Sequence, residues 1–512
     1  MEFLQGIDPR DYQQKIFETC IEKNCLVVLP TGLGKTLIAL MLTIERMKSF
    51  PGERVVFLAP TKPLAEQHLE TFRKHLPELF GDMQLFTGKV KAEDRKKIWE
   101  TADIIFSTPQ CIGNDVKNGL YDLKEVCLLI EDEAHRCIRN YSYNYVSGKY
   151  QEQSKHPRIL GLTASPGSEI SKIKEICKNL AIESVELRTR DSPDVKPYLQ
   201  ELEFRKVFVN FPPEFEEMRQ ALQKLFYQYV KSLKKRRLLW GFPSKTNLIK
   251  LQKRLSLSLG KGSRNFSYMH GVSECAQAIK IQHALELLET QNLFIFDKYL
   301  KNLFKQAADN KSKGVKILVK KPEFNFVYSK STELIAKGQE HPKMDKLMEL
   351  VENEKGLNEK MKIIVFTQFR DSASHIAKNL HKIKGINARV FVGQAKREGS
   401  GMSQEEQKEM IREFSLGRMN ILCATSIGEE GLDIPEVNAV IFYEPVPSAI
   451  RAIQRAGRTA RLMKGKLIIL MTKKTRDEAH YYVSRFRERK MHSAIDQIKK
   501  DLRQKDKQNT LG

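Results

Sequence analysis

The chain has 512 residues, with 87 Lys or Arg against 63 Asp or Glu, and its formal net charge is +24 at pH 7. This length predicts two to four domains with large cores, and the positive charge predicts an anionic polymer or surface as partner, the alternative being a solvated basic face. The N-terminus lacks a signal-peptide layout and no run of about 18 apolar residues occurs, which predicts a soluble intracellular protein without a membrane span. No Cys-x-x-Cys pair is present, so neither a zinc site nor a disulfide framework is expected.

The first predicted helix begins after Pro9 and runs toward Lys23, with apolar positions at Ile16, Phe17 and Ile21. It precedes a short apolar run at residues 25–28, which predicts a β-strand.

Residues 29–36 read Leu-Pro-Thr-Gly-Leu-Gly-Lys-Thr and are followed by an apolar helical pattern. Strand, glycine-rich turn and helix in this order predict a phosphate-binding loop, because backbone N–H groups at a helix N-terminus attract anions. Lys35 is expected to reach the β- and γ-phosphates and Thr36 to ligate Mg²⁺. Leu29 stands where the usual pattern has Gly, and the alternative is a turn that caps a core helix. The residues expected at the phosphates are Thr31, Gly32, Gly34, Lys35 and Thr36.

Apolar runs then alternate with helical patterns at residues 55–59, 104–107, 126–130 and 159–162. This alternation predicts a parallel, doubly wound α/β sheet whose functional loops lie at the C-terminal ends of the strands.

Two adjacent carboxylates, Asp132 and Glu133, follow the apolar run at residues 126–130. Such a pair suits phosphoryl transfer, with Asp132 holding Mg²⁺ and Glu133 orienting and deprotonating the attacking water. An acidic surface turn is the alternative, and it would rarely follow so long an apolar run.

The order of the phosphate loop, Asp-Glu-Ala-His at residues 132–135 and Thr-Ala-Ser at residues 163–165 resembles the helicases of superfamily 2. The resemblance implies two RecA-like motor domains with ATP between them. It also implies that Arg10 and Gln13 grip adenine, since Gln13 has the amide donor and acceptor to read the edge of the base and Arg10 can stack on the ring.

The same resemblance implies contacts with a nucleic-acid backbone through small hydroxyls and exposed N–H groups. For Thr108 the alternative of a helix-cap residue stays open. The residues concerned in the first domain are Thr61, Lys62, Gly88 and Thr108.

From residue 201 onward, long helical patterns at residues 214–235 and 273–305 replace the alternation of strands and helices. Residues 231–268 contain eleven Lys or Arg, no acidic residue and several aromatic side chains. This composition predicts contacts with phosphates, and a solvated helix face is the alternative. The insertion resembles the helical thumb of the archaeal Hef and Fanconi-anaemia group M branch and, more loosely, the insertion of viral-RNA sensors and Dicer helicases. Its cations singled out here are Lys234, Lys235, Arg236 and Arg237.

A second α/β unit follows, with strands predicted at residues 362–367, 388–392, 420–425 and 439–443. Arg458 and Arg461 are three residues apart and therefore share one helix face, as two guanidinium groups converging on a γ-phosphate require. The resemblance adds Gln454 to the catalytic residues. It further implies nucleotide contacts by Gly431 and Asp433 and nucleic-acid contacts by Thr367 and Thr425.

The last segment is a charged helical pattern. Glu488-Arg489-Lys490 with Asp496 resembles the nuclease core associated with this branch, but Ala occupies position 494 and the Asp falls two residues late. A solvated helix is expected instead of a nuclease. Hef-like chains continue into a nuclease domain, so this chain is expected to be the helicase part, with a nuclease domain or partner beyond it.

We therefore expect an α/β fold with a motor domain at residues 1–200, a helical insertion at 201–325, a second motor domain at 326–475 and a tail at 476–512. The expected function is an ATP- and Mg²⁺-dependent DNA helicase and translocase acting on forked or branched DNA in replication-fork repair. Two alternatives remain: a duplex-RNA-stimulated ATPase of the sensor or Dicer type, and a clamp in which nucleotide gates binding without hydrolysis.

Overall fold

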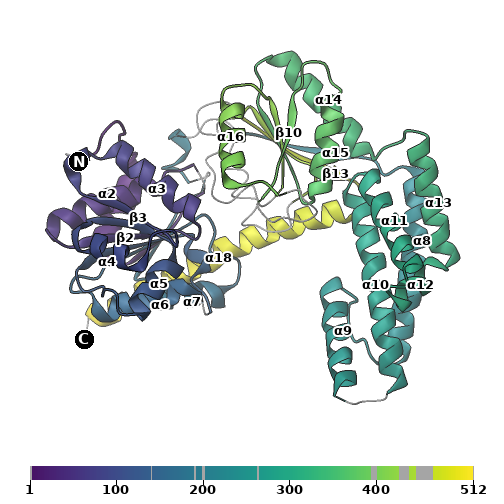
Figure 1. Ribbon diagram of the computed structural model, residues 1–512, viewed down its shortest axis with the longest axis horizontal. Helices are drawn as coiled ribbons and strands as arrows, with labels where there is room; N and C mark the ends of the chain where they lie inside the picture. Colours follow the sequence, from purple (N-terminus) through teal and green to yellow (C-terminus); the bar gives the residue numbers. More distant parts are fainter. Residues whose placement is uncertain are drawn as a thin grey trace.

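The computed structural model describes residues 3–30, 32–139, 141–189, 192–198, 202–261, 265–393, 401–425, 437–445 and 465–510. Within these residues, two parallel β-sheets are covered by helices, and a helical bundle lies beside the second sheet (Figure 1). The expected fold, two parallel-sheet domains with a helical insertion between them in the chain, is confirmed.

The first sheet has the strand order β3-β4-β2-β5-β6-β1-β7, and every described pairing in it is parallel. The order places β5, whose end carries the acidic residues, at the centre of the sheet, and β1, which precedes the phosphate loop, two positions away beyond β6. The strands are β1 (Cys25–Val28), β2 (Arg54–Leu58), β3 (Met83–Phe86), β4 (Ile104–Ser107), β5 (Val126–Asp132), β6 (Ile159–Thr163) and β7 (Ser184–Leu187).

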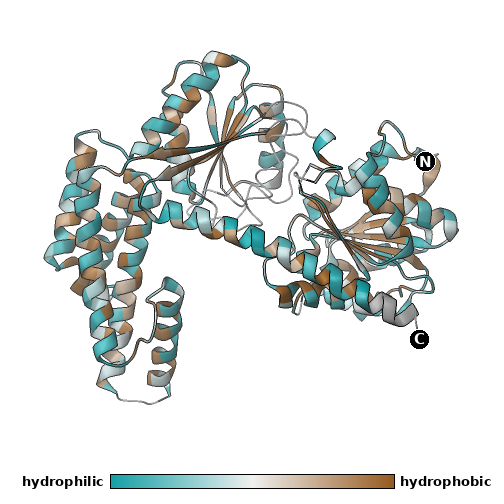
Figure 2. Ribbon diagram, turned by 180° about the vertical axis from the view of Figure 1, so that it is seen from behind, coloured by the Kyte–Doolittle hydropathy of each residue, from teal (hydrophilic) through white to brown (hydrophobic). Residues whose placement is uncertain are grey.

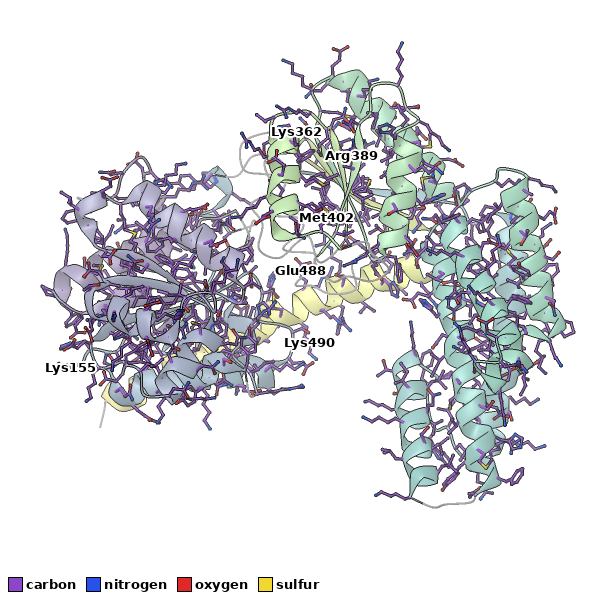
Figure 3. All side chains as sticks on the ribbon, viewed as in Figure 1. Lys155, Lys362, Arg389, Met402, Glu488 and Lys490 are labelled. Atoms are coloured by element: carbon purple, nitrogen blue, oxygen red, sulfur yellow. The ribbon has the colours of Figure 1, made fainter. Side chains whose placement is uncertain are left out.

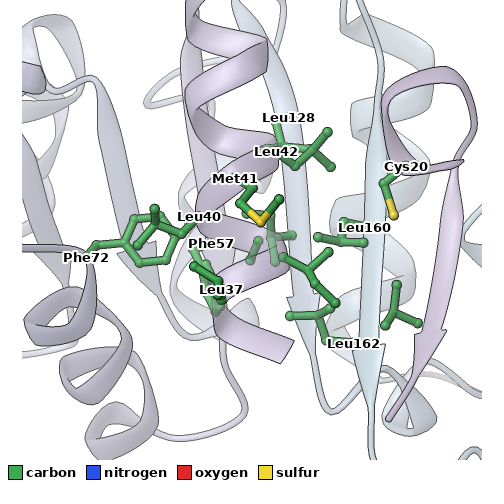
Figure 4. Close-up of a cluster of buried hydrophobic side chains, with 14 of the residues drawn as sticks. Cys20, Leu37, Leu40, Met41, Leu42, Phe57, Phe72, Leu128, Leu160 and Leu162 are labelled. Carbon is green, nitrogen blue, oxygen red and sulfur yellow. The ribbon is translucent and has the colours of Figure 1, made fainter. Parts of the chain in front are cut away.

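Both faces of this sheet are buried because successive side chains of a strand point to opposite faces. Val55 and Phe57 join the core under α1–α3, whereas Val56 and Leu58 join the core under α4–α7. Figure 4 shows the first of these cores, with Phe72 of α3 beside residues of α2. The helices are α1 (Asp11–Glu22), α2 (Lys35–Ser49), α3 (Lys62–His75), α4 (Ala92–Thr101), α5 (Pro109–Lys117), α6 (Ser142–Gln153) and α7 (Ile170–Asn179), with 3-10 turns η1 (Glu78–Phe80), η2 (Ala134–Arg136) and η3 (Lys196–Tyr198).

The insertion is a bundle with one apolar core of its own. Hydropathy colouring shows hydrophobic and hydrophilic residues alternating along the helices of the bundle (Figure 2). Its last helix crosses the expected boundary at residue 325. The helices are α8 (Pro213–Lys235), α9 (Lys245–Gly260), α10 (Phe266–Thr290), α11 (Leu293–Ala308), α12 (Lys313–Val319) and α13 (Pro322–Ala336).

The second sheet has the order β10-β11-β9-β12-β13-β8, also parallel in the described pairings. Strand β8 pairs with β13, so the second sheet begins before the insertion and not at residue 326 as the sequence suggests. The elements are β8 (Leu202–Val209), α14 (Pro342–Leu357), β9 (Ile363–Thr367), α15 (Arg370–Leu380), β10 (Ala388–Phe391), α16 (Gln404–Ser415), β11 (Ile421–Thr425), β12 (Ala439–Phe442) and β13 (Gly465–Thr472).

The last helix, α18 (Arg476–Thr510), crosses from the second domain to the first (Figure 1). Met491, Ala494, Ile495 and Ile498 are buried in the core under α4–α7. The expectation of a solvated tail is therefore wrong for this part of the helix, because one face of it completes the core of the first domain.

All eight cysteines are buried and free, as expected for small core residues. None of the described helices is both long and apolar enough to cross a membrane.

Candidate active site

The phosphate loop joins β1 to α2 and contains two glycines with positive φ. Gly32 has φ 88° and Gly34, the N-cap of α2, has φ 76°. A Cβ on Gly34 would meet Nε2 of Gln13 and displace that amide, and the positive φ itself strains any larger residue at this position. Lys35 Nζ donates to the carbonyl oxygen of Leu29 at 2.9 Å. The loop thus offers an open helix N-terminus with a lysine beside it, which is the arrangement that phosphate groups bind.

Helix α1 anchors this loop. The Tyr12 hydroxyl and Nε2 of Gln13 both donate to the carbonyl oxygen of Leu33, at 2.8 and 3.1 Å. Oε1 of Gln13 accepts the backbone N–H of Arg10 at 2.9 Å. The guanidinium of Arg10 lies 5.4 Å from the ring centroid of Tyr198. The two residues expected to grip adenine therefore lie beside the phosphate loop, together with an aromatic ring that the sequence did not single out.

A buried histidine joins the two residues expected to hold Mg²⁺. Nε2 of His68 lies 3.0 Å from Oδ2 of Asp132, and its Nδ1 lies 3.5 Å from Oγ1 of Thr36. Burial raises the pKa of Asp132, but the hydrogen bond with His68 and the electrostatic interactions with His68 and Lys35 outweigh it, so the pKa is lowered from its ordinary value. Asp132 is therefore ionised, as a metal ligand must be.

This pair of ligands fits Mg²⁺, which binds proteins through few carboxylates and fills its other positions with water and phosphate oxygens. Within the part of the chain that the structure describes, no group of three or more His, Cys, Asp and Glu side chains could hold a metal ion by itself. The hydroxyl of Thr36 and the carboxylate of Asp132 therefore suit a cation that arrives with a nucleotide.

Glu133 directly follows β5 and has the left-handed backbone conformation, with φ 52° and ψ 45°, which non-glycine residues adopt rarely. Its Oε2 lies 3.1 Å from Nδ1 of His135, and the same nitrogen lies 3.2 Å from Oγ1 of Thr163. Oγ1 of Thr163 accepts the backbone N–H of Ser165 at 3.2 Å. A polar network therefore runs from the candidate base after β5 to Ser165 after β6.

Three family models match consecutive parts of the chain. Residues 10–173 match the DEAD/DEAH box helicases, residues 214–338 match a helical bundle described for an ATP-dependent RNA helicase, and residues 342–463 match the helicase conserved C-terminal domain. The crystal structure of the Pyrococcus furiosus Hef helicase domain is similar with a TM-score of 0.74 and 42% identity, over 94% of this chain and 100% of that one. The chain belongs to the ATP-hydrolysing superfamily 2 helicases of the Hef and Fanconi anaemia group M branch.

Curated members of this branch are longer than the chain. A Methanocaldococcus jannaschii protein described as an ATP-dependent RNA helicase is 38% identical over 95% of this chain and 60% of its own length. The ATP-dependent DNA helicase mph1 of Sclerotinia sclerotiorum is 32% identical over 92% of the chain and 40% of its own length. The Fanconi anemia group M protein homolog of Mus musculus is 31% identical over 96% of the chain and 26% of its own length. The chain thus corresponds to a part of each of these helicases.

The residues expected to hold nucleic acid in the first domain lie after adjacent parallel strands. Gly88 follows β3, Thr108 follows β4 and Thr61 follows β2, and these strands are neighbours. Thr61 and Thr108 are the N-cap residues of α3 and α5, but neither side chain makes a cap hydrogen bond. Lys62 pairs with Glu66 at 3.1 Å. Gly88, Thr108 and Thr61 thus form a row along the edge where these strands end, and its small hydroxyls suit contacts with phosphates. The nucleic-acid role of Thr108 stays a prediction.

The two threonines expected to contact nucleic acid in the second domain are buried. Thr367 and Thr425 end the neighbouring strands β9 and β11 and are register partners. Thr367 is 1% exposed and donates to Oε1 of Glu444 at 3.2 Å, while Thr425 is 2% exposed. This structure places neither hydroxyl at the surface, and the Thr367 hydroxyl bonds Glu444. The nucleic-acid contacts of both threonines stay predictions.

The remaining predicted residues cannot be placed. Their expected roles in binding nucleotide and in hydrolysis stay predictions. Thr31, Gly431, Asp433, Gln454, Arg458 and Arg461 lie outside the described residues.

The four cations singled out in the insertion lie at the C-terminal end of α8 and the start of the turn that leads to α9, here called together the basic turn, and are all exposed. Arg236 is 3.7 Å from Glu274 in an ion pair, and the other three side chains extend the same basic surface. Trp240 and Phe242, on the same turn, are 74% and 78% exposed. Exposed aromatic rings beside cations are typical of surfaces that bind nucleic acid. The set of cations is Lys234, Lys235, Arg236 and Arg237.

Proposed function

We propose that the chain is a nucleic-acid-stimulated ATPase that translocates along DNA and acts on forked or branched DNA. The observation that supports it best is the grouping at the ends of β1 and β5, where Lys35 and Thr36 of the loop face the ionised Asp132 across His68. A lysine, a hydroxyl and a carboxylate grouped around one histidine at the strand ends suit a nucleotide with its metal ion. Glu133 adjoins this group and is the candidate base.

Each residue has a part in hydrolysis that follows from its position. Lys35 exchanges its bond to the Leu29 carbonyl for phosphate oxygens. His68 contacts both the Thr36 hydroxyl and the Asp132 carboxylate and thereby fixes their positions relative to one another. Glu133 orients the attacking water and accepts its proton. Mg²⁺, when bound, neutralises charge that develops on the phosphate oxygens.

A DNA substrate is supported by the charge of the chain and by its relatives. The Sclerotinia relative is named an ATP-dependent DNA helicase. The row formed by Gly88, Thr108 and Thr61 and the basic turn of the insertion offer two separate surfaces to a backbone. Two surfaces suit a substrate with two arms, which is the reason for proposing forked or branched DNA.

RNA is a second candidate substrate. The Methanocaldococcus relative and the family model of the bundle are both described as belonging to an RNA helicase. A protein that requires RNA would contact the 2′-hydroxyl groups that distinguish it from DNA.

The decisive experiment measures ATP hydrolysis with single-stranded, duplex, forked and four-way DNA and with matching RNA at one salt concentration. We expect stimulation by DNA, strongest with forked or four-way molecules, and none in a Lys35→Ala control. Stimulation by RNA alone would establish the second candidate. Tight binding of ATP and DNA without turnover would indicate a nucleotide-gated clamp and contradict the proposal.

A further inference from the structure

The beginning of α18 is held in the second domain by a buried ion pair. Nζ of Lys343, in α14, lies 2.9 Å from Oδ2 of Asp477 and donates to the carbonyl oxygen of Thr290 at 2.6 Å, and both charged side chains are fully buried. Oδ2 of Asp477 also accepts the backbone N–H of Thr472 at 3.0 Å. The backbone N–H of Arg476 donates to Oε2 of Glu289 in α10 at 3.0 Å. This end of α18 is therefore fixed to β13, α14 and the insertion together.

The later part of α18 is held in the first domain. Met491, Ile495 and Ile498 are 2%, 0% and 2% exposed and belong to the core under α4–α7. The hydroxyl of Ser165 donates to Sδ of Met491 at 2.8 Å, and Ser165 is fully buried. Met491 of this helix is therefore the last member of the polar network that begins at Glu133.

Between these two anchors the helix is mostly exposed. Residues 485–487, 489 and 490 are exposed, and Phe486 is 66% exposed. Figure 3 labels Glu488 and Lys490 along this middle part, where the helix passes between the two domains. An α-helix rises about 1.5 Å per residue, so the anchors at Asp477 and Ile498 are about 30 Å apart along a continuous helix.

We propose that α18 transmits the position of the second domain to the hydrolysis site and that Met491 is the positioning residue at its end. The path runs from Met491 through Ser165, Thr163 and His135 to Glu133. Movement of the second domain relative to the first displaces the anchor at Asp477, and a continuous helix carries that displacement to Met491. Because the Ser165 hydroxyl donates to the Met491 sulfur, a shift of Met491 changes the position of Ser165 and hence the polar network that leads to Glu133.

This coupling rests on the proposed function in one respect: the domains must move relative to one another during turnover. It also implies the reverse effect, since coupling between two sites acts in both directions. Nucleotide bound at the hydrolysis site is then expected to alter the docking of α18 on the first domain. The two directions allow two independent measurements.

The first measurement is the rate of ATP hydrolysis at saturating forked DNA. Met491→Leu keeps the apolar volume and removes the sulfur acceptor, and Ile498→Val is the matched control from the same buried face. We expect Met491→Leu to lower kcat by about fivefold or more with the KM for ATP within about twofold, and Ile498→Val to leave kcat within about twofold. A smaller loss in Met491→Leu, or an equal loss in Ile498→Val, would overturn the role of Met491.

A second pair of variants tests the helix itself. Arg489→Pro interrupts α18 in its exposed middle because proline removes a backbone hydrogen bond and clashes with the preceding turn. Arg489→Ala is the matched control. We expect the proline variant alone to lose kcat by about fivefold or more, and an unaffected proline variant would contradict transmission through the helix.

The second measurement requires no nucleic acid. Hydrogen–deuterium exchange of α18 is followed with and without ADP–beryllium fluoride. We expect nucleotide to change exchange at residues 488–498 in the wild type, and the change to be reduced in Met491→Leu. No change in the wild type overturns the coupling even where DNA stimulates hydrolysis. A clear change in a protein that no DNA stimulates upholds the coupling and rejects the proposed function.

Discussion

Three consecutive acidic residues at the end of β5 occupy three different environments. Glu131 is fully buried, and burial raises its pKa well above the ordinary value, an effect that the Cys137 thiol offsets only in part. Asp132 has its pKa lowered because the contacts with His68 and Lys35 outweigh burial. Glu133 lies beside His135. Environment thus separates an acid whose pKa is raised, a candidate ligand whose pKa is lowered and a candidate base within one tripeptide.

The role of Glu133 is tested by Glu133→Gln. The substitution keeps the shape of the side chain and removes its ability to accept a proton. Hydrolysis should fall by about 10²-fold or more while a fluorescent ATP analogue binds nearly as well as before. Glu131→Gln is the control, since its side chain is buried in the strand. Turnover of Glu133→Gln within about threefold of the wild type would exclude it as the base.

The sequence did not single out His68, and the contacts of this residue lead to a separate prediction. Because it holds both Thr36 and Asp132, His68→Ala should raise the Mg²⁺ concentration needed for half-maximal hydrolysis by about 10-fold or more, as loss of partners to metal ligands does elsewhere. The control is His75→Ala, near the end of the same helix, where Nδ1 bonds the carbonyl oxygen of Gln5. An unchanged Mg²⁺ requirement in His68→Ala would mean that this histidine contributes to packing and does not position the metal ligands.

At the scale of elements, helix α14 begins at a buried histidine. His341 is fully buried against Phe211 and Phe215, and its Nδ1 accepts the backbone N–H of Lys343 at 3.2 Å. Burial, followed by the charge of Lys343, lowers the pKa of His341 well below its ordinary value. The imidazole is therefore neutral in the folded protein.

A pH dependence follows from this neutral imidazole. The unfolded chain takes up a proton at this histidine near pH 6.5 and the folded protein does not, so stability falls as pH decreases below about 6.5, by at most about 1.4 kcal/mol per pH unit. His341→Asn keeps a cap acceptor and should flatten that fall between pH 6.5 and 5 in urea unfolding. His381→Asn, at an exposed position, should not. Equal slopes for the wild type and His341→Asn would contradict the assignment.

The basic turn between α8 and α9 is tested by salt dependence. Changing Lys234, Lys235, Arg236 and Arg237 to Gln should weaken DNA binding and flatten its salt dependence, since each lost phosphate contact removes roughly 0.9 from the slope of log affinity against log salt. Hydrolysis without DNA should hardly change, because the turn lies outside both sheets. The loss should be larger on forked than on linear duplex if the turn grips a second arm.

A control for this variant carries the same change in charge. Lys96, Lys97, Lys382 and Lys384 are exposed cations of α4 and of the segment after α15, and their replacement by Gln should leave the slope nearly unchanged. Equal slopes for the two fourfold variants on both substrates would show that the basic turn is an ordinary solvated surface.

At the scale of the molecule, the sequence predicts what depends on local order and misses what depends on distant partners. Apolar runs followed by polar turns sufficed to predict both parallel sheets and the position of Lys35 and Asp132 at the strand ends, because parallel strands bring such turns to one edge. The bridging role of His68 could not be predicted, since its partner Asp132 is 64 residues away.

Strand β8 and helix α18 illustrate the same limit. β8 is mostly exposed and pairs with β13 across the whole insertion, so no local pattern assigns it to the second sheet. For α18, the spacing of Met491, Ala494, Ile495 and Ile498 does match one helix face. High charge masked this signal and led to the prediction of a solvated helix.

The last prediction concerns how the two domains act together. Their described surfaces already approach at one point, where Nζ of Lys408 in α16 lies 3.6 Å from Oε2 of Glu66 in α3. We expect closure to bring Arg458 and Arg461 of the second domain to the nucleotide held by the first. Arg458→Ala and Arg461→Ala should each lower DNA-stimulated hydrolysis by about 10³-fold or more, the range for arginines that stabilise the transferring phosphoryl group, with ATP and DNA still bound. Arg418→Ala is the control, because this exposed arginine of the same domain pairs with Glu413 at 2.6 Å. Full turnover in either test variant would assign that arginine a structural role, and loss of ATP binding together with turnover would mean that it acts before closure.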